Sequence, residues 1–145
     1  LKQFQTDQIS ALLRDELGSY LLKSTSLSGF LTGFIDLICV WQGKYYLMDY
    51  KTNFLGSEAD SYLPAALGAT MSEHQYVLQY WIYTLVLHHH LEFFLPEYRY
   101  EEHFGGVYYL FLRGMSPENP GSGVYSTRPS REKLEKLAKI TRASR

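Results

Sequence analysis

The stretch GFIDLICVWQGKYYLMDYK, residues 33–51, decides the fold class of this chain. Its two halves, 33–41 and 44–51, are rich in β-branched and aromatic side chains, which favour β-strands. Gln42 and Gly43 separate the halves, and a two-residue loop with glycine is typical of a hairpin, although Gln-Gly is a weaker turn signal than Asn-Gly. The sequence therefore predicts an antiparallel β-hairpin over these residues.

The predicted hairpin brings three charged side chains together. If Trp41 pairs with Lys44 around the turn, counting outward along both strands puts Asp36 opposite Asp49. Opposed side chains in an antiparallel pair have Cβ atoms about 4.5–5.5 Å apart. Lys51 follows Asp49 by two residues, so its side chain lies on the same face of the sheet as both carboxylates. A loop one residue longer or shorter would move Asp36 to the other face.

Two carboxylates on one face of a hairpin require a neutralising partner, because the rest of that face is apolar and would otherwise be part of the core. Its other members are Phe34, Ile38, Val40, Tyr45 and Leu47. Mg²⁺ prefers oxygen ligands such as carboxylates, and an adjacent lysine suits the orientation of a water or the stabilisation of a transition state. The pattern indicates metal-assisted hydrolysis of a phosphodiester. A single Asp-x-Lys is usually an exposed ion pair, so this interpretation depends on the pairing of Asp36 with Asp49.

Two segments have the pattern of helices. In residues 7–17 the apolar side chains fall at helical spacing, and Gly18 is a typical helix end. The run 73–93 contains no Gly or Pro, and overlapping capping-box patterns begin at Thr70 and Ser72. The sequence therefore predicts a short first helix and a long helix starting near residue 73.

The remaining segments complete an α/β fold. Residues 52–69 read as an irregular crossing segment, 104–112 as a buried strand and 114–129 as a loop. Ser130 can cap a final helix. These elements predict an α/β domain with a central mixed β-sheet flanked by helices.

Composition limits the possible classes of function. The chain has 145 residues, 46% of them hydrophobic, which suits one globular domain. A net charge of −1 gives no overall basic field, so contact with nucleic acid must be local. The single Cys39 excludes an internal disulfide, and no apolar run reaches the roughly 20 residues of a membrane span. We expect a cytoplasmic protein without membrane contact and, because residue 1 is Leu1, a piece of a longer polypeptide.

The charged set resembles the metal-binding core of the PD-(D/E)xK nucleases, in which one strand supplies an Asp and the next supplies Asp-x-Lys. Here these are Asp36 and Asp49-Tyr-Lys51. On the following helix, Gln79-x-x-x-Tyr83 resembles the motif of the RecB-type branch, and residues four apart share a helix face.

The resemblance extends to the C-terminal nuclease domain of the RecB-type exodeoxyribonuclease V family. Segments 33–56, 75–87 and 101–114 are similar to it, and the likeness covers most of residues 28–129. It implies a restriction-endonuclease-like core in a single nuclease-domain fragment, residues 1–145. The expected parts are a leading helix and loop at 1–27, a catalytic core at 28–112, and a loop with a C-terminal helix at 113–145.

The resemblance also assigns roles. It implies a Mg²⁺-dependent exodeoxyribonuclease in which Asp36, Asp49 and the backbone carbonyl of Tyr50 bind the metal and Lys51 is the catalytic lysine. The residues implied to border the site and position DNA are Gln79, Tyr83 and Tyr76. Family members carry a further metal-binding His and an acidic residue upstream, so we expect this fragment to bind Mg²⁺ more weakly than they do.

The implied partners are single- and double-stranded DNA, RecC- and RecD-type subunits and a RecA-type recombinase. The sequence has no G-x-x-x-x-G-K-[ST] motif, so it lacks the ATPase part of such enzymes. Two other functions stay open: a catalytically idle docking module for those proteins, and a nucleic-acid binder without chemistry.

The remaining reactive side chains favour structural roles. Residues 88–90 are three consecutive His on a predicted helix, where they point in different directions and cannot share one zinc ion. They predict a cationic helix end. Cys39 predicts a buried, inert thiol, and Tyr76, Tyr80 and Tyr83 at helical spacing are more typical of a core than of a base-stacking surface.

Overall fold

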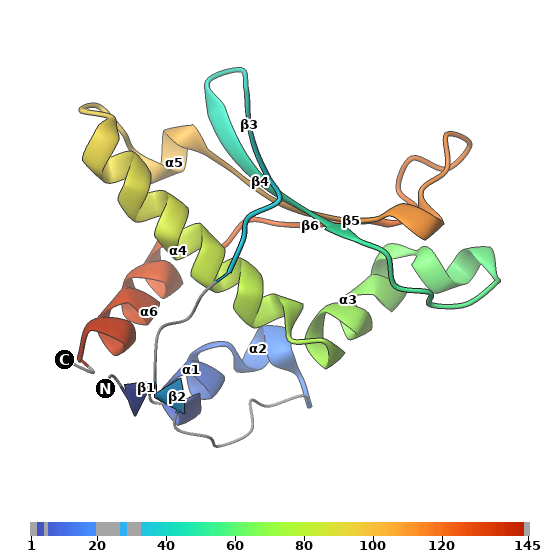
Figure 1. The fold of residues 1–145 in the computed structure, drawn as a ribbon, viewed down its shortest axis with the longest axis horizontal. Helices are drawn as coiled ribbons and strands as arrows, with labels where there is room; N and C mark the ends of the chain where they lie inside the picture. Colours follow the sequence, from blue (N-terminus) through green and yellow to red (C-terminus); the bar gives the residue numbers. More distant parts are fainter. Residues whose placement is uncertain (1–2, 5, 20–26, 29–32, 144–145) are drawn as a thin grey trace.

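A four-stranded mixed sheet forms one layer of this computed structural model, which describes residues 3–4, 6–19, 27–28 and 33–143 (Figure 1). The strand order is β3-β4-β5-β6. The central pair β4–β5 is parallel and the two outer pairs are antiparallel, which confirms the predicted α/β class with a mixed sheet. The strands are β3 (Leu37–Trp41), β4 (Lys44–Lys51), β5 (Phe104–Phe111) and β6 (Val124–Thr127).

The hairpin register is confirmed within the observed ladder, but the predicted pair of Asp36 with Asp49 lies one step beyond the end of that ladder. Trp41 pairs with Lys44, and the ladder continues to Leu37 opposite Met48. Gln42 and Gly43 both have positive φ, 50° and 75°, as a tight two-residue turn between twisted strands requires. The first strand is shorter than expected, because it begins at residue 37 and not at 33.

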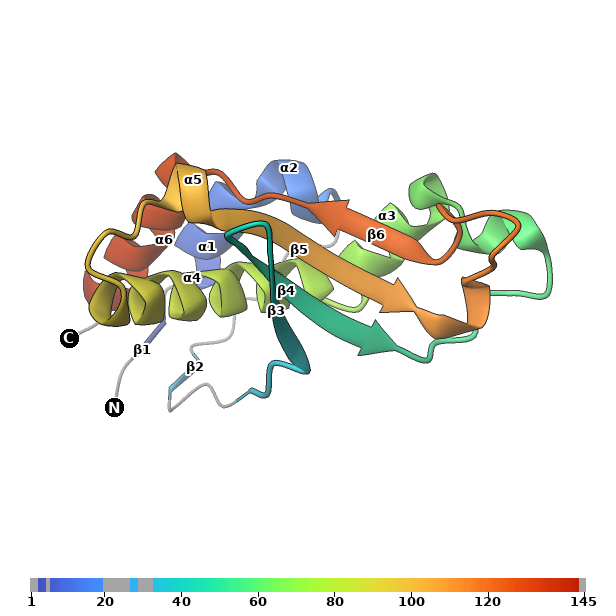
Figure 2. The same ribbon diagram turned by 90° about the horizontal axis from the view of Figure 1, so that it is seen from above.

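Helices cover one face of the sheet in two further layers (Figure 1). Helix α4 (Tyr76–Phe94) lies against the sheet, and β4, β5 and β6 run side by side across it (Figure 2). Behind α4 lie α1 (Thr6–Leu12), α2 (Arg14–Leu17) and α6 (Arg131–Ala143). The core fills the space between these layers, and its largest fully buried side chains include Trp81, Tyr80, Tyr109, Phe104 and Leu13.

Shorter elements complete the fold. Helix α3 (Pro64–Glu73) precedes α4, and α5 (Tyr100–His103) leads into β5. Single 3₁₀ turns are η1 (Ala59–Tyr62) and η2 (Leu112–Gly114). A separate two-stranded ladder pairs β1 (Gln3–Phe4) with β2 (Leu27–Ser28). Within the described parts of the chain, no helix has both the length and the apolar character needed to cross a bilayer.

The predicted start of the long helix is wrong. Thr70 and Ser72 lie inside α3, and the chain breaks at Gln75, which has a left-handed φ of 58°. Their hydroxyls donate to backbone carbonyls: Thr70 Oγ1 to Ala66, and Ser72 Oγ to Glu16 and Gly68. Because these hydroxyls serve as donors inside a helix, they do not act as N-terminal caps.

Other segment predictions have mixed outcomes. The helix expected at 7–17 is interrupted at Leu13 into α1 and α2 and ends at Gly18, as predicted. Residues 52–69 contain η1 and the start of α3, and the expected loop 114–129 contains β6. The strand at 104–112 is confirmed, and Ser130 Oγ accepts a hydrogen bond from Lys133 N at the start of α6.

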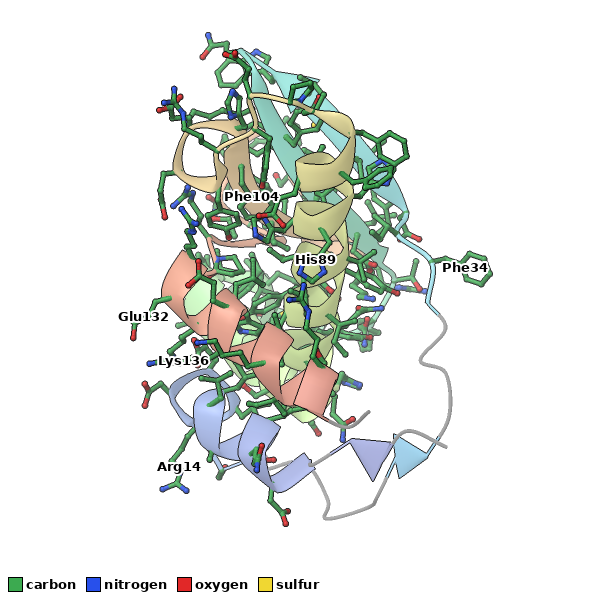
Figure 3. All side chains as sticks on the ribbon, turned by 90° about the vertical axis from the view of Figure 1, so that its left-hand side faces the viewer. Arg14, Phe34, His89, Phe104, Glu132 and Lys136 are labelled. Atoms are coloured by element: carbon green, nitrogen blue, oxygen red, sulfur yellow. The ribbon has the colours of Figure 1, made fainter. Side chains whose placement is uncertain are left out.

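The outer part of the β3–β4 hairpin is not part of the core, contrary to expectation. It extends beyond α4 (Figure 1), so Ile38 and Val40 are exposed although their face was predicted to be apolar core. Phe34 is 83% exposed and projects away from the body of the molecule (Figure 3). Cys39 is half-buried rather than buried. On this face Leu47 and Asp49, nearer the far end of β4, are buried, and Lys51 is largely shielded from solvent.

Candidate active site

Asp49 and Lys51 meet at the carboxyl end of β4, beneath α4. Lys51 Nζ lies 2.5 Å from Asp49 Oδ1, and both side chains are largely shielded from solvent. Burial raises the pKa of the Asp49 carboxyl above its ordinary value of 3.8, while the hydrogen bond and charge of Lys51 act in the opposite direction. The Lys51 ammonium group therefore offsets only part of the cost of burying the charged Asp49 carboxylate.

Asp36 lies at the exposed side of the same site. Its Oδ2 accepts a 2.9 Å hydrogen bond from the backbone N–H of Tyr50. This bond takes the place of a strand contact just before β3 begins, and it holds Asp36 against the strand that carries Asp49. The charge of Asp36 also contributes to the raised pKa of Asp49, so the two carboxylates act on each other electrostatically.

Gln79 links Lys51 to the helix layer. Its Oε1 accepts hydrogen bonds from Lys51 Nζ at 3.1 Å and from the Tyr109 hydroxyl at 2.8 Å. Its Nε2 donates to the Tyr83 hydroxyl at 3.2 Å, one helical turn further along α4. The structure thus brings both residues of the predicted helix motif to the lysine, with Gln79 in direct contact.

Two aromatic rings enclose the ammonium group of Lys51. Its Nζ lies 4.0 Å from the ring centroid of Tyr76 and 5.1 Å from that of Tyr109, within the range of cation–π attraction. The Tyr76 hydroxyl donates to Asn53 Oδ1 at 3.2 Å, which ties the start of α4 to the segment after β4. Together with Gln79 and Asp49, these rings restrict where the ammonium can point.

Tyr109 is a site residue that sequence reasoning missed. It belongs to β5, pairs with Asp49 across the parallel β4–β5 ladder, and is fully buried. The strand 104–112 was predicted, but its neighbour and direction in the sheet were not. Only the parallel register places the Tyr109 ring beside Lys51.

The approach of the chain to α4 also depends on Gly33. A Cβ atom at this position would lie 2.6 Å from the Tyr83 hydroxyl oxygen, closer than such atoms come in real structures. Glycine therefore lets residue 33 pass directly over Tyr83, three residues before Asp36.

The oxygen donors of the site suit Mg²⁺. Asp36, Asp49 and the carbonyl of Tyr50 are hard ligands of the kind this ion prefers. Among the described residues, the only ion pair or hydrogen bond to the Asp49 carboxylate comes from Lys51. A buried carboxylate with a raised pKa gains from a nearby cation. No cluster of three or more His, Cys, Asp or Glu side chains that could hold a metal ion exists in the described part of the chain, this site included.

His88 does not contribute to the predicted cationic helix end. His88 is buried between α4 and its neighbours, and burial lowers its pKa, so this ring is neutral near pH 7. Its Nδ1 lies 3.2 Å from the Tyr98 hydroxyl, and its ring packs edge-on against Tyr100. The other charged or titratable groups that influence it are Glu92, His89, Arg131 and Glu135. His89 faces α6 (Figure 3), where its Nε2 lies 3.3 Å from Arg142.

Comparisons with known proteins identify clear relatives. No protein-family model matches the chain. It is 50% identical over 109 residues, 75% of its length, to the RecBCD enzyme subunit RecB of Escherichia coli. It is 49% identical over 121 residues to the RecB subunit of Haemophilus influenzae, and 40% identical over 122 residues to that of Mycobacterium tuberculosis. These matches cover 83% and 79% of the chain. The chain spans only 9–11% of the length of these relatives.

Proposed function

Because the chain is homologous to part of the RecB subunit over at least three quarters of its length, we propose that it is the nuclease module of a RecB-type protein. In this proposal it hydrolyses phosphodiester bonds of single- and double-stranded DNA as part of double-strand break repair by recombination. The observation that supports it best is the convergence of Asp49, Lys51 and Gln79 beside Asp36.

Asp36, Asp49 and the Tyr50 carbonyl are the proposed ligands of Mg²⁺. When bound, the ion neutralises the two carboxylates and polarises a phosphodiester oxygen. Asp36 is the exposed member of the pair, so DNA approaches from its side of the sheet. Asp49 is the shielded member and holds Lys51 in place through their ion pair.

Lys51 is the proposed catalytic residue. An ammonium group has three N–H donors. Asp49 and Gln79 accept two of them, which leaves one for the attacking water or a phosphate oxygen. The rings of Tyr76 and Tyr109 limit its movement and shield it from bulk water, which strengthens its interaction with developing negative charge.

Gln79 and Tyr83 position Lys51 in this proposal. Gln79 bonds to the lysine, and Tyr83 holds the Gln79 amide. Tyr76 borders the site and links it to Asn53. These residues therefore act on DNA cleavage through the catalytic side chain, and Tyr109 joins them from β5.

Cleavage of labelled DNA tests the proposed function. The chain is expected to cut single-stranded and linear double-stranded DNA with Mg²⁺ and to lose this activity in EDTA. Asp49→Ala and Lys51→Ala are expected to remove cutting, whereas the exposed matched controls Asp7→Ala and Lys139→Ala retain it. Cutting that persists in both site variants would show that another part of the preparation carries the activity.

A second candidate function is docking without catalysis. Val86, Phe93 and Phe94 expose large apolar side chains on α4, with Phe93 82% exposed. Such side chains on a surface are suited to contact with another protein. The proposed partners are RecC- and RecD-type subunits and a RecA-type recombinase. Phe93→Glu is expected to weaken co-purification with these partners. If the chain is a nuclease, this variant still cleaves DNA like the parent. If the chain is a docking module without activity, neither the parent nor any variant cleaves DNA.

A further inference from the structure

A cavity of about 590 Å³ lies beyond the carboxyl ends of β4 and β5 and has no role in the site described above. Its walls come from the segment after β4 and from the turn between β5 and β6. The lining side chains that matter here are Phe54, Glu58, Arg113, Ser116 and Asn119. The volume is within the range of pockets that bind small molecules or single residues of a polymer.

The cavity adjoins the catalytic strand directly. Phe54 follows Lys51 by three residues, a distance of at most about 10 Å in an extended chain. Arg113 Nε donates to the Thr52 carbonyl at 2.8 Å. The Tyr62 hydroxyl donates to the Asn53 carbonyl at 3.3 Å and accepts from Leu55 N at 3.0 Å. These bonds hold the segment between Lys51 and the cavity in one conformation.

The lining combines an aromatic surface with an available cation. Phe54 is 69% exposed although it lines a cavity, so its ring is open to a planar group. Arg113 is exposed and uses its Nε on Thr52, and within the described residues its two Nη groups have no partner. Guanidinium groups bind phosphate through such pairs of N–H donors, and exposed aromatic rings stack on bases.

Polar side chains on the same wall complete the set. Asn119 offers an amide that can donate and accept, and Glu58 offers a carboxylate that accepts from base amino groups or sugar hydroxyls. The Ser116 hydroxyl is already engaged, because it donates to Glu118 Oε2 at 2.5 Å and accepts from Glu118 N at 3.3 Å. Glu58 repels phosphate, so a bound phosphate is directed to Arg113. An aromatic ring, one guanidinium and several polar groups fit the base, phosphate and sugar of one nucleotide.

We propose that this cavity binds a nucleotide of the DNA strand next to the cleaved phosphodiester, with the base stacked on Phe54 and the phosphate on Arg113. The inference rests on the proposed function for the identity of the substrate as DNA. It adds a subsite that holds the strand on one side of Lys51.

Binding of fluorescent oligothymidylates, measured by anisotropy in EDTA to prevent cleavage, tests the subsite. Loss of one stacked base is expected to weaken binding of Phe54→Ala roughly 5- to 150-fold. Phe93→Ala, which removes an exposed ring at the far end of α4, is the matched control and binds like the parent. Phe54→Trp is expected to bind at least as tightly as the parent, because it keeps a stacking surface.

The salt dependence separates the two contacts. Arg113→Gln is expected to lower the slope of log Kd against log salt by about 0.7, the value for one phosphate on a single strand. Phe54→Ala leaves this slope unchanged, and Arg14→Gln on α2 is the control for loss of an exposed arginine. Circular dichroism verifies that Arg113→Gln, which also loses the bond to Thr52, remains folded.

Several outcomes would overturn the subsite. One is equal affinity of Phe54→Ala and Phe93→Ala for the oligothymidylate. Another is an unchanged slope of log Kd against log salt in Arg113→Gln that remains folded. Competition by free thymidine monophosphate as strong as that by the oligonucleotide would indicate a site for free nucleotides instead of a strand. The proposed function has its own test: if Lys51→Ala abolishes cleavage while Phe54→Ala binds normally, the nuclease stands and the subsite is wrong. If Phe54→Ala loses binding but no preparation cleaves DNA, the cavity binds a nucleotide of DNA, but the nuclease and the placement of the cavity beside a cleaved bond are both wrong.

Discussion

Replacing Tyr109 by phenylalanine removes one hydroxyl from the centre of the site and leaves its surroundings in place. The Tyr109 hydroxyl donates a 2.8 Å hydrogen bond to Gln79 Oε1. That oxygen also accepts from Lys51 Nζ at 3.1 Å, so the substitution leaves no buried acceptor without a partner. The ring stays near the lysine, where its centroid is 5.1 Å from Nζ. The expected effect is therefore that of a single hydrogen bond.

The size of the effect follows from that bond. A hydrogen bond within a protein contributes about 0.5–1.5 kcal/mol to stability. For a chain of this length, the loss corresponds to a fall in Tm of roughly 2–6 °C. If the bond restrains Gln79 and Lys51 fully in the transition state, kcat falls roughly two- to twelvefold. KM is expected to remain unchanged, because Tyr109 is fully buried and does not contact DNA.

Tyr100→Phe is the matched control for this substitution. Tyr100 is also fully buried, and its hydroxyl donates to the Pro129 carbonyl at 2.6 Å, away from the site. It should lower the Tm at least as much as Tyr109→Phe does, without changing kcat. In a Gln79→Ala background, Tyr109→Phe is expected to cause no further loss of kcat. Full kcat in Tyr109→Phe, or equal losses of kcat in the two tyrosine variants, would refute a positioning role for Tyr109.

Three further predictions concern the metal, a close contact and a buried histidine. Mg²⁺ at about 100 times its Kd should raise the free energy of unfolding of the parent by about 2.7 kcal/mol. Asp49→Asn should lose this gain in stability. A similar gain in the parent and in Asp49→Asn would mean that the ion binds elsewhere. Gly33→Ala should lower kcat, because the added Cβ would lie 2.6 Å from the Tyr83 hydroxyl oxygen and would displace that hydroxyl. Gly68→Ala in α3 is the control: no atom lies within 4 Å of its Cβ, so it should retain kcat and raise the Tm. Burial lowers the pKa of His88 below 6.5, so as pH falls below that value the unfolded chain takes up a proton that the folded chain does not. Stability measured by urea unfolding should therefore decrease on acidification, and less so in His88→Gln; an equal decrease in both would assign the pH dependence to other groups.

The hairpin shows how far local pattern can carry a prediction. Alternation along both strands and the two-residue turn were enough to predict the register from Trp41–Lys44 to Leu37–Met48, which the structure confirms. A register in a short hairpin depends on loop length and side-chain period, both of which are read directly from the sequence. The chain also showed its final helix and the strand at 104–111 by the same kind of local signal.

Predictions from local sequence pattern were wrong where a residue type is compatible with several structural roles. Ser72 and Thr70 look like helix caps in sequence, but inside α3 their hydroxyls bond to backbone carbonyls, one of them from the distant Glu16. Val40 looks like a core residue by alternation, but its side chain is 58% exposed on the outer part of the hairpin. His88 looks like a cation near a helix end, but packing against Tyr98 and Tyr100 buries it. In each case a contact remote in sequence decided the outcome.

The sequence by itself determined the α/β class, the hairpin and the position of Asp49 and Lys51 on one face of β4, because these depend on interactions between residues close in the chain. The tertiary structure decided that Asp49 is buried while Asp36 is exposed, since burial depends on how α4 crosses the sheet. It also placed Tyr109 beside the lysine through the parallel β4–β5 pairing. A parallel pair joins strands more than 50 residues apart here, and which strands pair depends on the packing of the whole domain.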